Sequence, residues 1–335
     1  MHTNLFISNF NIPSHMRMSL LQKTTWFLLP CLAFVPLYFW LISRSGNIYL
    51  RKEQLLEKHI SQVNCLVMGS SHVLHGVNPE YLPSGAFNMG NLSQDLGTDI
   101  RIVKRYLNDM KNLHTVAFDI DYLTTFYSMT DRENKWRDYY YNYFMNLDYT
   151  TSYNQLRASL HLLEPGVVQY TLQGILLKMM HQRTEFIMPM NTWGYSQRTF
   201  SKNINERTGK KRAAAHSKLY SKAFYDQNLQ IFRETLAMLH NRHIRVILFS
   251  TPVTDFYASN LDPRLVNLQE EFIHEVQQQY ALEYGNFTHD KRFNLQDFSD
   301  NDHLNNQGAV KFSKILCNEL FNHPKSGPPA IAMKR

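Results

Sequence analysis

Cysteine is scarce in this sequence, with three in 335 residues. Cys31, Cys65 and Cys317 lie far apart, and they show neither the spacing of a disulfide framework nor that of a zinc site. We therefore expect three buried thiols rather than covalent or metal cross-links. No internal repeat is visible, and the 44% hydrophobic content is ample for a globular core.

Negative charge is also in short supply. Lysine and arginine number 35 against 28 aspartates and glutamates, which leaves a formal net charge of +7. Such a balance favours an anionic neighbourhood, such as lipid headgroups, an acidic glycan or nucleic acid. Because the sequence contains no nucleic-acid-binding motif, we expect no nucleic-acid partner.

One long hydrophobic run stands near the N-terminus. Residues 26–42 carry no charge, and their length is at the short end of the roughly 17–25 residues that span a bilayer. Trp26 and Trp40 resemble interfacial aromatic residues, and Lys23 and Arg44 bracket the run as snorkelling cations do. The pattern predicts a single-pass membrane anchor at 26–42 that follows an N-terminal tail at 1–25.

Two alternatives to an anchor stay open. The run could be the apolar region of a cleaved signal peptide, although residues 43–46 offer no cleavage site of the usual small-residue type. Pro30 and Pro36 would also suit a kinked or interfacial helix. Positive charges flank the run on both sides, so they do not decide which end faces the cytoplasm.

After a polar connector at 47–62, short apolar runs alternate with helical patterns. Apolar residues between 96 and 110 recur at steps of 4, 3, 4 and 3, which is one face of a helix. Strands separated by helices predict an α/β domain at 63–322 with a mostly parallel sheet covered on both faces. The alternation stops at about 122–223, which predicts an insertion, and 323–335 reads as a disordered tail. The predicted strands are 63–68, 86–89, 115–120, 244–250 and 282–287.

A serine follows the first predicted strand directly, in Gly69-Ser70-Ser71-His72. A glycine there permits a tight turn, and a small residue at 70 lets the hydroxyl of Ser71 stand clear as a nucleophile. The alternative is that both serines only cap the turn. His72 and His75 are expected to be lining or surface residues, because a base adjacent in sequence to its nucleophile is seldom well aimed.

An acid and a histidine stand near the C-terminus, in Asp300-Asn301-Asp302-His303. Asp300 can bind one imidazole nitrogen of His303 and leave the other free to act as a base toward a serine. Alternatively, Asp302 or Asn305 caps the closing helix and His303 is solvated. Both this segment and Ser71 follow strands, and active sites in parallel sheets lie at the carboxyl ends of strands.

These two blocks resemble those of the SGNH (GDSL-like) hydrolase superfamily. The resemblance implies a three-layer, flavodoxin-like parallel sheet, here with a largely helical insertion and an N-terminal transmembrane helix. It implies that Ser71 is the nucleophile, His303 the base and Asp300 the residue that orients the base, with no cofactor. No metal is expected either, because Asp119 and Asp121 have no third ligand of suitable spacing.

The oxyanion hole is where the sequence departs from that family. The glycine of the second block corresponds to Gly90, which could equally be an ordinary strand-end glycine. The third block, Gly-x-Asn-Asp, is absent, because the loop after the third strand reads Asp119-Ile120-Asp121-Tyr122. We therefore take Asn91 as a substitute side-chain donor beside the amides of Ser71 and Gly90. This departure puts hydrolytic efficiency in doubt more than the fold.

An N-terminal anchor before such a domain is similar to that of bacterial envelope proteins that transfer D-alanine to lipoteichoic acid or O-acetylate polysaccharides. The resemblance implies a serine esterase or O-acyltransferase at the cell membrane, with an extracytoplasmic catalytic domain and an acylated glycan or related polymer as substrate. It allows a membrane-embedded acyl-donor protein as a partner. The alternative is a catalytically inactive module that binds polymer or partners in an envelope assembly.

Two segments of the insertion offer binding surfaces for either function. The aromatic residues of 136–144 suit a stacking platform for sugars or an amphipathic face at the membrane, or else they form core. The segment 198–212 holds six cationic residues against one acid. It predicts a contact with an anionic polymer or headgroups, or a mobile solvated loop.

Overall fold

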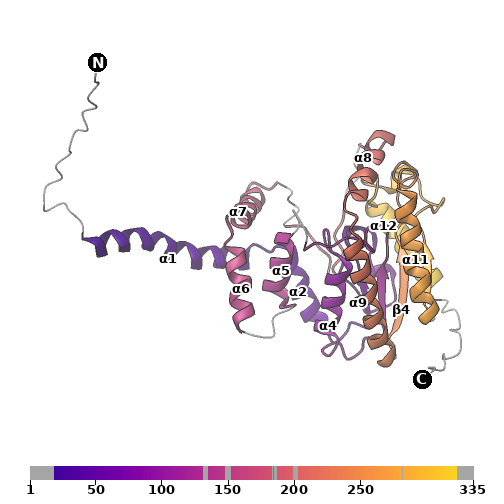
Figure 1. Cartoon of the computed structure of the whole chain (residues 1–335), viewed down its shortest axis with the longest axis horizontal. Coiled ribbons are helices and arrows are strands. Elements are labelled where there is room, and N and C mark those ends of the chain that lie inside the picture. Colours follow the sequence, from indigo (N-terminus) through magenta and orange to yellow (C-terminus); the bar gives the residue numbers. More distant parts are fainter. Residues whose placement is uncertain are drawn as a thin grey trace, which may run out of the picture. The chain divides into compact units, whose positions relative to one another are not determined.

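The computed structural model describes residues 19–130, 135–147, 152–182, 184, 187–198, 203–280 and 282–322. The chain divides into two units, residues 1–46 and residues 47–335 (Figure 1). Most of the predicted N-terminal tail and the whole predicted tail at 323–335 lie outside the described residues.

The first unit is built on one apolar helix, α1 (Leu20–Arg44). Ser19 begins it with a capping box, in which its hydroxyl accepts from the amide of Gln22 while the Gln22 side chain accepts from the Ser19 amide. The cap starts the helix several residues before the predicted run, and Pro30 and Pro36 stand inside it. By length and composition, α1 is long and apolar enough to cross a membrane.

The second unit is centred on a parallel sheet of five strands, as the sequence predicts. Their order is β2-β1-β3-β4-β5, and every neighbouring pair is parallel. Each predicted apolar run contains a strand, slightly shorter than the run itself. The strands are β1 (Cys65–Met68), β2 (Ala86–Asn88), β3 (Thr115–Asp119), β4 (Arg245–Ser250) and β5 (Glu283–Asn286).

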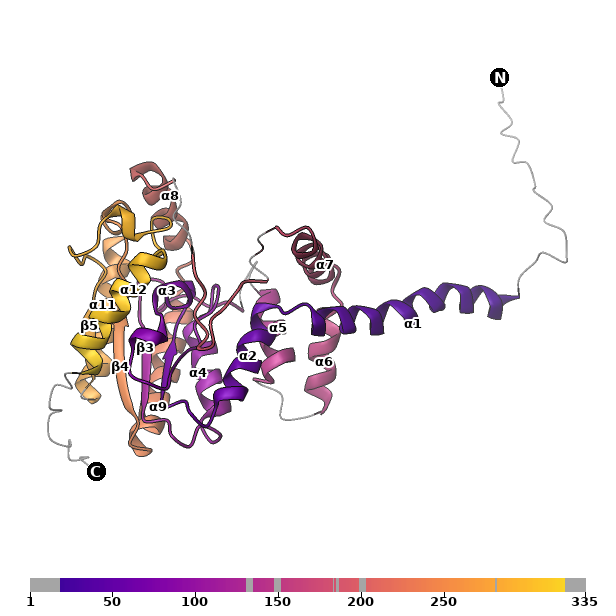
Figure 2. The ribbon, with the colours of Figure 1, turned by 180° about the vertical axis from the view of Figure 1, so that it is seen from behind.

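Helices cover both faces of this sheet. On one face, α3 (Ser71–Gly76) contacts α12 (Asn306–Leu316), and their apolar side chains join those of the strands in one core cluster (Figure 2). On the other face, Phe118 of β3 packs edge-on against Phe232, which stacks on Phe272. The helices of that face are α4 (Leu96–Tyr106), α9 (Lys222–Asn241) and α11 (Pro263–Gln279) (Figure 1).

The residues between β3 and α9 are largely helical, as the sequence predicts for the insertion. Within α5, the side chains of Tyr139, Tyr140, Tyr141 and Phe144 are buried, so these members of the aromatic segment form core. The connector predicted at 47–62 contains a helix, α2, which packs on α5. The helices of these segments are α2 (Ile48–His59), α5 (Lys135–Met145), α6 (Ser152–Leu162), α7 (Pro165–Met179) and α8 (Glu206–Ser217).

Short helical turns complete the second unit. Cys65 is buried in β1, but Cys317 is only half-buried at the end of α12, so the prediction of buried thiols is wrong for Cys317. Cys317 is the C-cap of α12 and packs against the edge of the core cluster, while the side chain of Cys31 lies outside the described part of the chain. The short elements are α10 (Asp255–Ala258), 3₁₀ turns at Pro79–Tyr81 and Leu295–Asp297, and a π-helical turn at Cys317–Phe321.

Candidate active site

A sharp turn at Gly69 joins β1 to α3. Gly69 has φ +151°, and a Cβ atom there would lie 2.6 Å from Cγ2 of Val73 and 2.8 Å from Cβ of Asp119. A side chain at this position would therefore collide with the helix that follows and with the neighbouring strand. The glycine lets the chain pass directly from the buried strand into α3 at the carboxyl end of the sheet.

The two serines after this turn have different roles. Ser70 is the N-cap of α3, and its hydroxyl accepts from the amide of His72 at 3.3 Å. Ser71 occupies the first helical position, and its Oγ lies 2.7 Å from Nε2 of His303. Capping is thus the role of Ser70, and the Ser71 hydroxyl is directed at the imidazole.

Asp300 organises the loop that carries His303. Its Oδ1 accepts from the backbone amides of Asp302 at 3.1 Å and His303 at 2.9 Å. The same carboxylate lies 2.9 and 3.1 Å from Nδ1 of His303. Asn305, two residues on, caps α12 by accepting from the amide of Gly308. The capping expected as an alternative role for this segment therefore coexists with the Asp300 and His303 pair.

Packing of α3 on α12 brings the two segments together. Ser71 and His303 are 232 positions apart in the sequence, but they start or precede helices that cover the same face of the sheet. A side chain from each reaches the same point beyond the carboxyl ends of the strands, where open parallel sheets hold their sites.

No protein-family model matches the chain, and no curated protein matches it. The interpretation of the site therefore rests on its geometry. Ser71, His303 and Asp300 form a hydrogen-bonded chain from hydroxyl to imidazole to carboxylate, which is the arrangement that activates a serine nucleophile.

The protonation states of His303 and Asp300 suit proton transfer from Ser71 to His303. Burial lowers the pKa of His303 below its ordinary value of 6.5, so the imidazole is neutral at neutral pH. Burial acts to raise the pKa of Asp300, but the attraction of His303 and their hydrogen bond outweigh it, and the pKa is lowered. Because Nδ1–H of His303 donates a hydrogen bond to the Asp300 carboxylate, the Nε2 lone pair faces the Ser71 hydroxyl.

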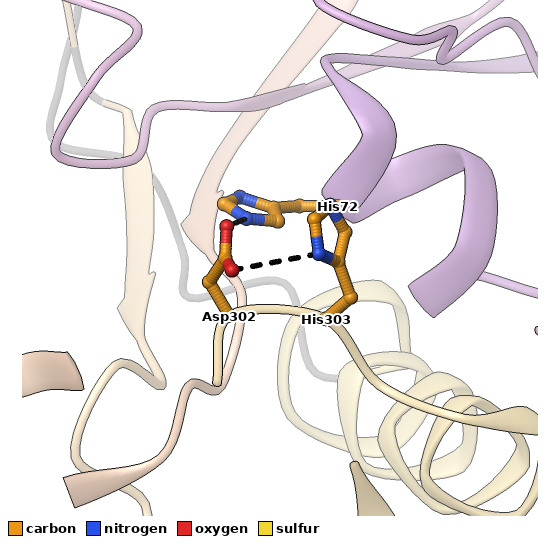
Figure 3. Close-up of side chains that lie close together, drawn as sticks. All are labelled: His72, Asp302 and His303. Atoms are coloured by element: carbon orange, nitrogen blue, oxygen red, sulfur yellow. Dashed lines mark hydrogen bonds and ion pairs between the residues drawn. The ribbon is translucent and has the colours of Figure 1, made fainter. Parts of the chain in front are cut away.

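A second histidine, His72, is held by two carboxylates behind the first. Its Nδ1 lies 2.6 Å from Oδ2 of Asp121, and its Nε2 lies 3.3 Å from Oδ2 of Asp302. Asp302 Oδ1 is also 3.6 Å from Nδ1 of His303, so Asp302 stands between the two rings (Figure 3). Burial acts to lower the pKa of His72, but the two carboxylates together raise it well above 6.5. We assign His72 as an imidazolium ion.

Two arginines of the basic segment 198–212 complete the electrostatics. The Arg212 Nε lies 3.1 and 3.0 Å from the carboxylate oxygens of Asp302, and an Arg198 guanidinium nitrogen lies 2.7 Å from Oδ2 of Asp300. The sequence indicates a basic segment but does not link it to this site. Two carboxylates beside His303 were a signal that partner cations are required, since buried charges are paired.

Two sets of side chains that could bind a metal ion share His72. One set is His72, Asp302 and His303, and the other is His72, Asp119 and Asp121. An imidazolium has no lone pair to give a metal ion, and both ring nitrogens of His72 face carboxylates. Burial raises the pKa of Asp119 well above its ordinary value, which favours a neutral acid. The part of the cluster that its printed contacts join is an internal hydrogen-bond and charge network of His72, Asp121, Asp302 and His303.

The structure does not bring Gly90 and Asn91 to the Ser71 cavity as the sequence predicts. The Gly90 amide donates to Oδ1 of Asn88 at 2.9 Å, while Nδ2 of this buried side chain donates to the carbonyls of Val73 in α3 and of Val77 just past it. The Asn91 side chain is fully buried, and its Oδ1 accepts from the amide of Leu92. The next two residues, Leu92 and Ser93, line the cavity instead, and Ser93 has φ +53°.

The cavity beside Ser71 has a volume of about 440 Å³ and a polar lining. The insertion supplies much of that lining, including Arg137 from α5 and Thr208 and Arg212 from α8. Gly209 lets α8 come close enough to do so, because a Cβ there would strike the backbone of Phe256 in α10. Such a cavity suits a hydroxylated or anionic molecule.

Proposed function

We propose that this chain is a membrane-anchored serine esterase or O-acyltransferase that acts on ester-linked acyl groups. The observation that carries the proposal is the line of contacts from Ser71 Oγ to His303 Nε2, at 2.7 Å, and from His303 Nδ1 to Asp300, at 2.9 Å. Heavy-atom distances in this range are those at which a base takes a proton from a nucleophile.

The reaction that this geometry suits has two halves. Ser71 Oγ attacks the acyl carbonyl carbon while His303 Nε2 takes the hydroxyl proton, and the tetrahedral intermediate expels the alcohol, to which His303 returns the proton. The acyl-Ser71 ester is then attacked by water or by an acceptor hydroxyl, again with His303 as base. Hydrolysis and transfer differ only in which acceptor reaches this ester.

The architecture supports a more specific assignment. The strand order 2-1-3-4-5 is that of flavodoxin-like sheets. With Ser71 after β1 and His303 before α12, the chain resembles the SGNH superfamily, and we place it there as part of the proposal. The apolar helix α1 serves as its membrane anchor. The domain is extracytoplasmic, the substrate is an acylated envelope glycan or related polymer, and a membrane-embedded protein is a candidate acyl donor.

A fluorophosphonate probe tests the proposal. The probe is expected to label the purified full-length protein at Ser71, because a neutral imidazole activates that hydroxyl, and peptide mapping locates the adduct. Ser71→Ala should abolish labelling. Ser70→Ala is the matched control, since it removes a neighbouring hydroxyl that caps α3 and is expected to leave a labelled protein. Absence of labelling in the folded wild-type protein contradicts the proposal.

A second function is favoured by one observation. The Gly90 amide, one of the three expected oxyanion donors, already donates to Asn88. This supports an inactive module that binds polymer in an envelope assembly. A folded protein that stays unlabelled, yet binds an acidic polysaccharide in a sedimentation assay, would favour that module over the enzyme.

The pH dependence of hydrolysis should report His303. Because burial depresses the His303 pKa below 6.5, kcat/KM is expected to fall as pH drops through that pKa, with the midpoint of the fall below pH 6.5. The charge of Asp300 raises the His303 pKa, so Asp300→Asn should move this acidic limb to still lower pH. An initial-rate profile on a soluble ester measures both. An acidic limb above pH 6.5 contradicts the prediction.

A further inference from the structure

Ser71 also lines a second cavity. It has a volume of about 260 Å³ and is set between α8 and the residues that follow β3. Its wall includes the side chains of Leu123, Tyr127, Ala215 and Leu219. The interpretation of this cavity rests on the proposed function. Its shape and lining indicate which kind of acyl group the site accepts.

The two cavities meet at the nucleophile but differ in their other catalytic residues. Ser71, Ser93 and Arg212 line both of them. His303 and Asp300 line only the first cavity, of about 440 Å³. An ester whose carbonyl carbon is attacked by Ser71 can therefore place its alcohol part in one cavity and its acyl part in the other.

The position of His303 decides which part of the ester enters which cavity. The leaving alcohol takes its proton from His303 Nε2, so the alcohol oxygen must lie on the side of the first cavity. That cavity has the polar lining that a sugar or another hydroxylated alcohol requires. The acyl chain then enters the second cavity.

The second cavity suits an uncharged, apolar chain. Its deeper polar side chains are already bonded within the protein: His72 to Asp121, and His216 Nδ1 to the Tyr257 hydroxyl at 2.6 Å. Burial lowers the pKa of His216 to about 4, so that imidazole is neutral. Arg212, which also lines this cavity, is paired with Asp302, so these charges already have partners within the protein and favour an uncharged acyl group over a charged or heavily hydroxylated one.

The cavity is also large for an acetyl group. A water molecule occupies about 30 Å³ of the liquid, so a space of about 260 Å³ has room for a chain of several carbon atoms. One end of α8 and the turn after it build part of its wall, since Arg212 and Ala215 lie three residues apart on the helix and Leu219 follows in the turn.

We propose that this second cavity, lined by Leu123, Tyr127, Ala215 and Leu219, binds the acyl chain of the substrate ester, and that the chain is apolar and several carbons long. Burial of a methylene group in such a site is expected to raise kcat/KM about fourfold for each carbon added, until the cavity is full.

Chain-length profiles test this proposal. With full-length protein in detergent, p-nitrophenyl acetate, butyrate and hexanoate share one leaving group and differ only in the acyl chain. The hexanoate-to-acetate ratio of kcat/KM is expected to be on the order of 10²-fold or more. Leu219→Trp, which fills the cavity, should lower that ratio at least tenfold. Ala215→Trp, in the same cavity wall, replaces it if the first variant does not fold.

Leu176→Trp is the matched control, because Leu176 is exposed on α7 and lines neither cavity. Its ratio should equal that of the wild type. A protein that a fluorophosphonate labels at Ser71, yet that hydrolyses all three esters at equal rates or keeps its ratio in Leu219→Trp, overturns the acyl-site proposal alone. A protein that reacts with no ester and no probe overturns the proposed function as well.

Discussion

His303→Ala is expected to lower kcat/KM for ester hydrolysis by about 10²-fold to 10⁴-fold, the range over which a positioned general base contributes. The reason is geometric: Nε2 of His303 lies 2.7 Å from Ser71 Oγ, and no equally close base faces that hydroxyl among the described residues. Initial rates on p-nitrophenyl butyrate measure the loss.

The losses caused by Ser71→Ala and His303→Ala are not expected to add. Ser71 and His303 act as one unit, so the double variant should be no slower than Ser71→Ala alone. His75→Ala is a matched control, because His75 lies near His303 but its Nδ1 bonds to the backbone carbonyl of Ser196. That control is expected to keep most of the activity. Losses that add in the double variant would show that the two side chains act independently.

The three side chains of the proposed triad were predictable because each carries a local pattern. Ser71 follows a short apolar strand and a glycine, and Asp300 precedes His303 by three residues. Both segments follow strands, and parallel strands place their carboxyl ends at one edge of the sheet. The sheet was predictable for the same reason, since alternating strands and helices leave few other arrangements.

The charge network was not predictable, because each of its bonds joins distant segments. His72 meets Asp121 and Asp302 at separations of 49 and 230 positions, and Arg212 meets Asp302 at a separation of 90. The arginine comes from an insertion with no regular alternation, so its place in space does not follow from the pattern of strands.

The partner of the Gly90 amide was not predictable for a different reason. Gly90 and Asn91 were chosen because their positions resemble those of a family pattern, and such a pattern assumes that the amide is free. Here the neighbouring Asn88, which is buried, accepts from the Gly90 amide and at the same time donates to the carbonyls of Val73 in α3 and of Val77 just past it. A buried amide side chain satisfies its own bonding capacity first. The spacing of residues in the sequence does not reveal that Asn88 competes for the Gly90 amide.

His72→Leu is expected to lower the free energy of unfolding by about 3–5 kcal/mol, because it leaves Asp121 and Asp302 buried without their shared cation. His75→Leu is the matched control on the same helix. The imidazole of His75 is neutral, since burial lowers the pKa of His75 to about 3. His75→Leu therefore removes one hydrogen bond and no charge, which costs about 1–3 kcal/mol. Urea unfolding followed by circular dichroism measures both.

The pH dependence of the two losses should have opposite signs. The pKa of His72 is raised in the fold, so its stabilising charge is fully present below the unfolded value of 6.5 and declines as pH rises through the folded pKa. The cost of His72→Leu should therefore shrink above pH 6.5, by up to about 1.4 kcal/mol per pH unit. The pKa of His75 is lowered, so wild-type His75 destabilises the fold below pH 6.5, and the cost of His75→Leu should shrink as pH falls. Parallel slopes for the two variants would contradict the assignment of His72 as a buried imidazolium.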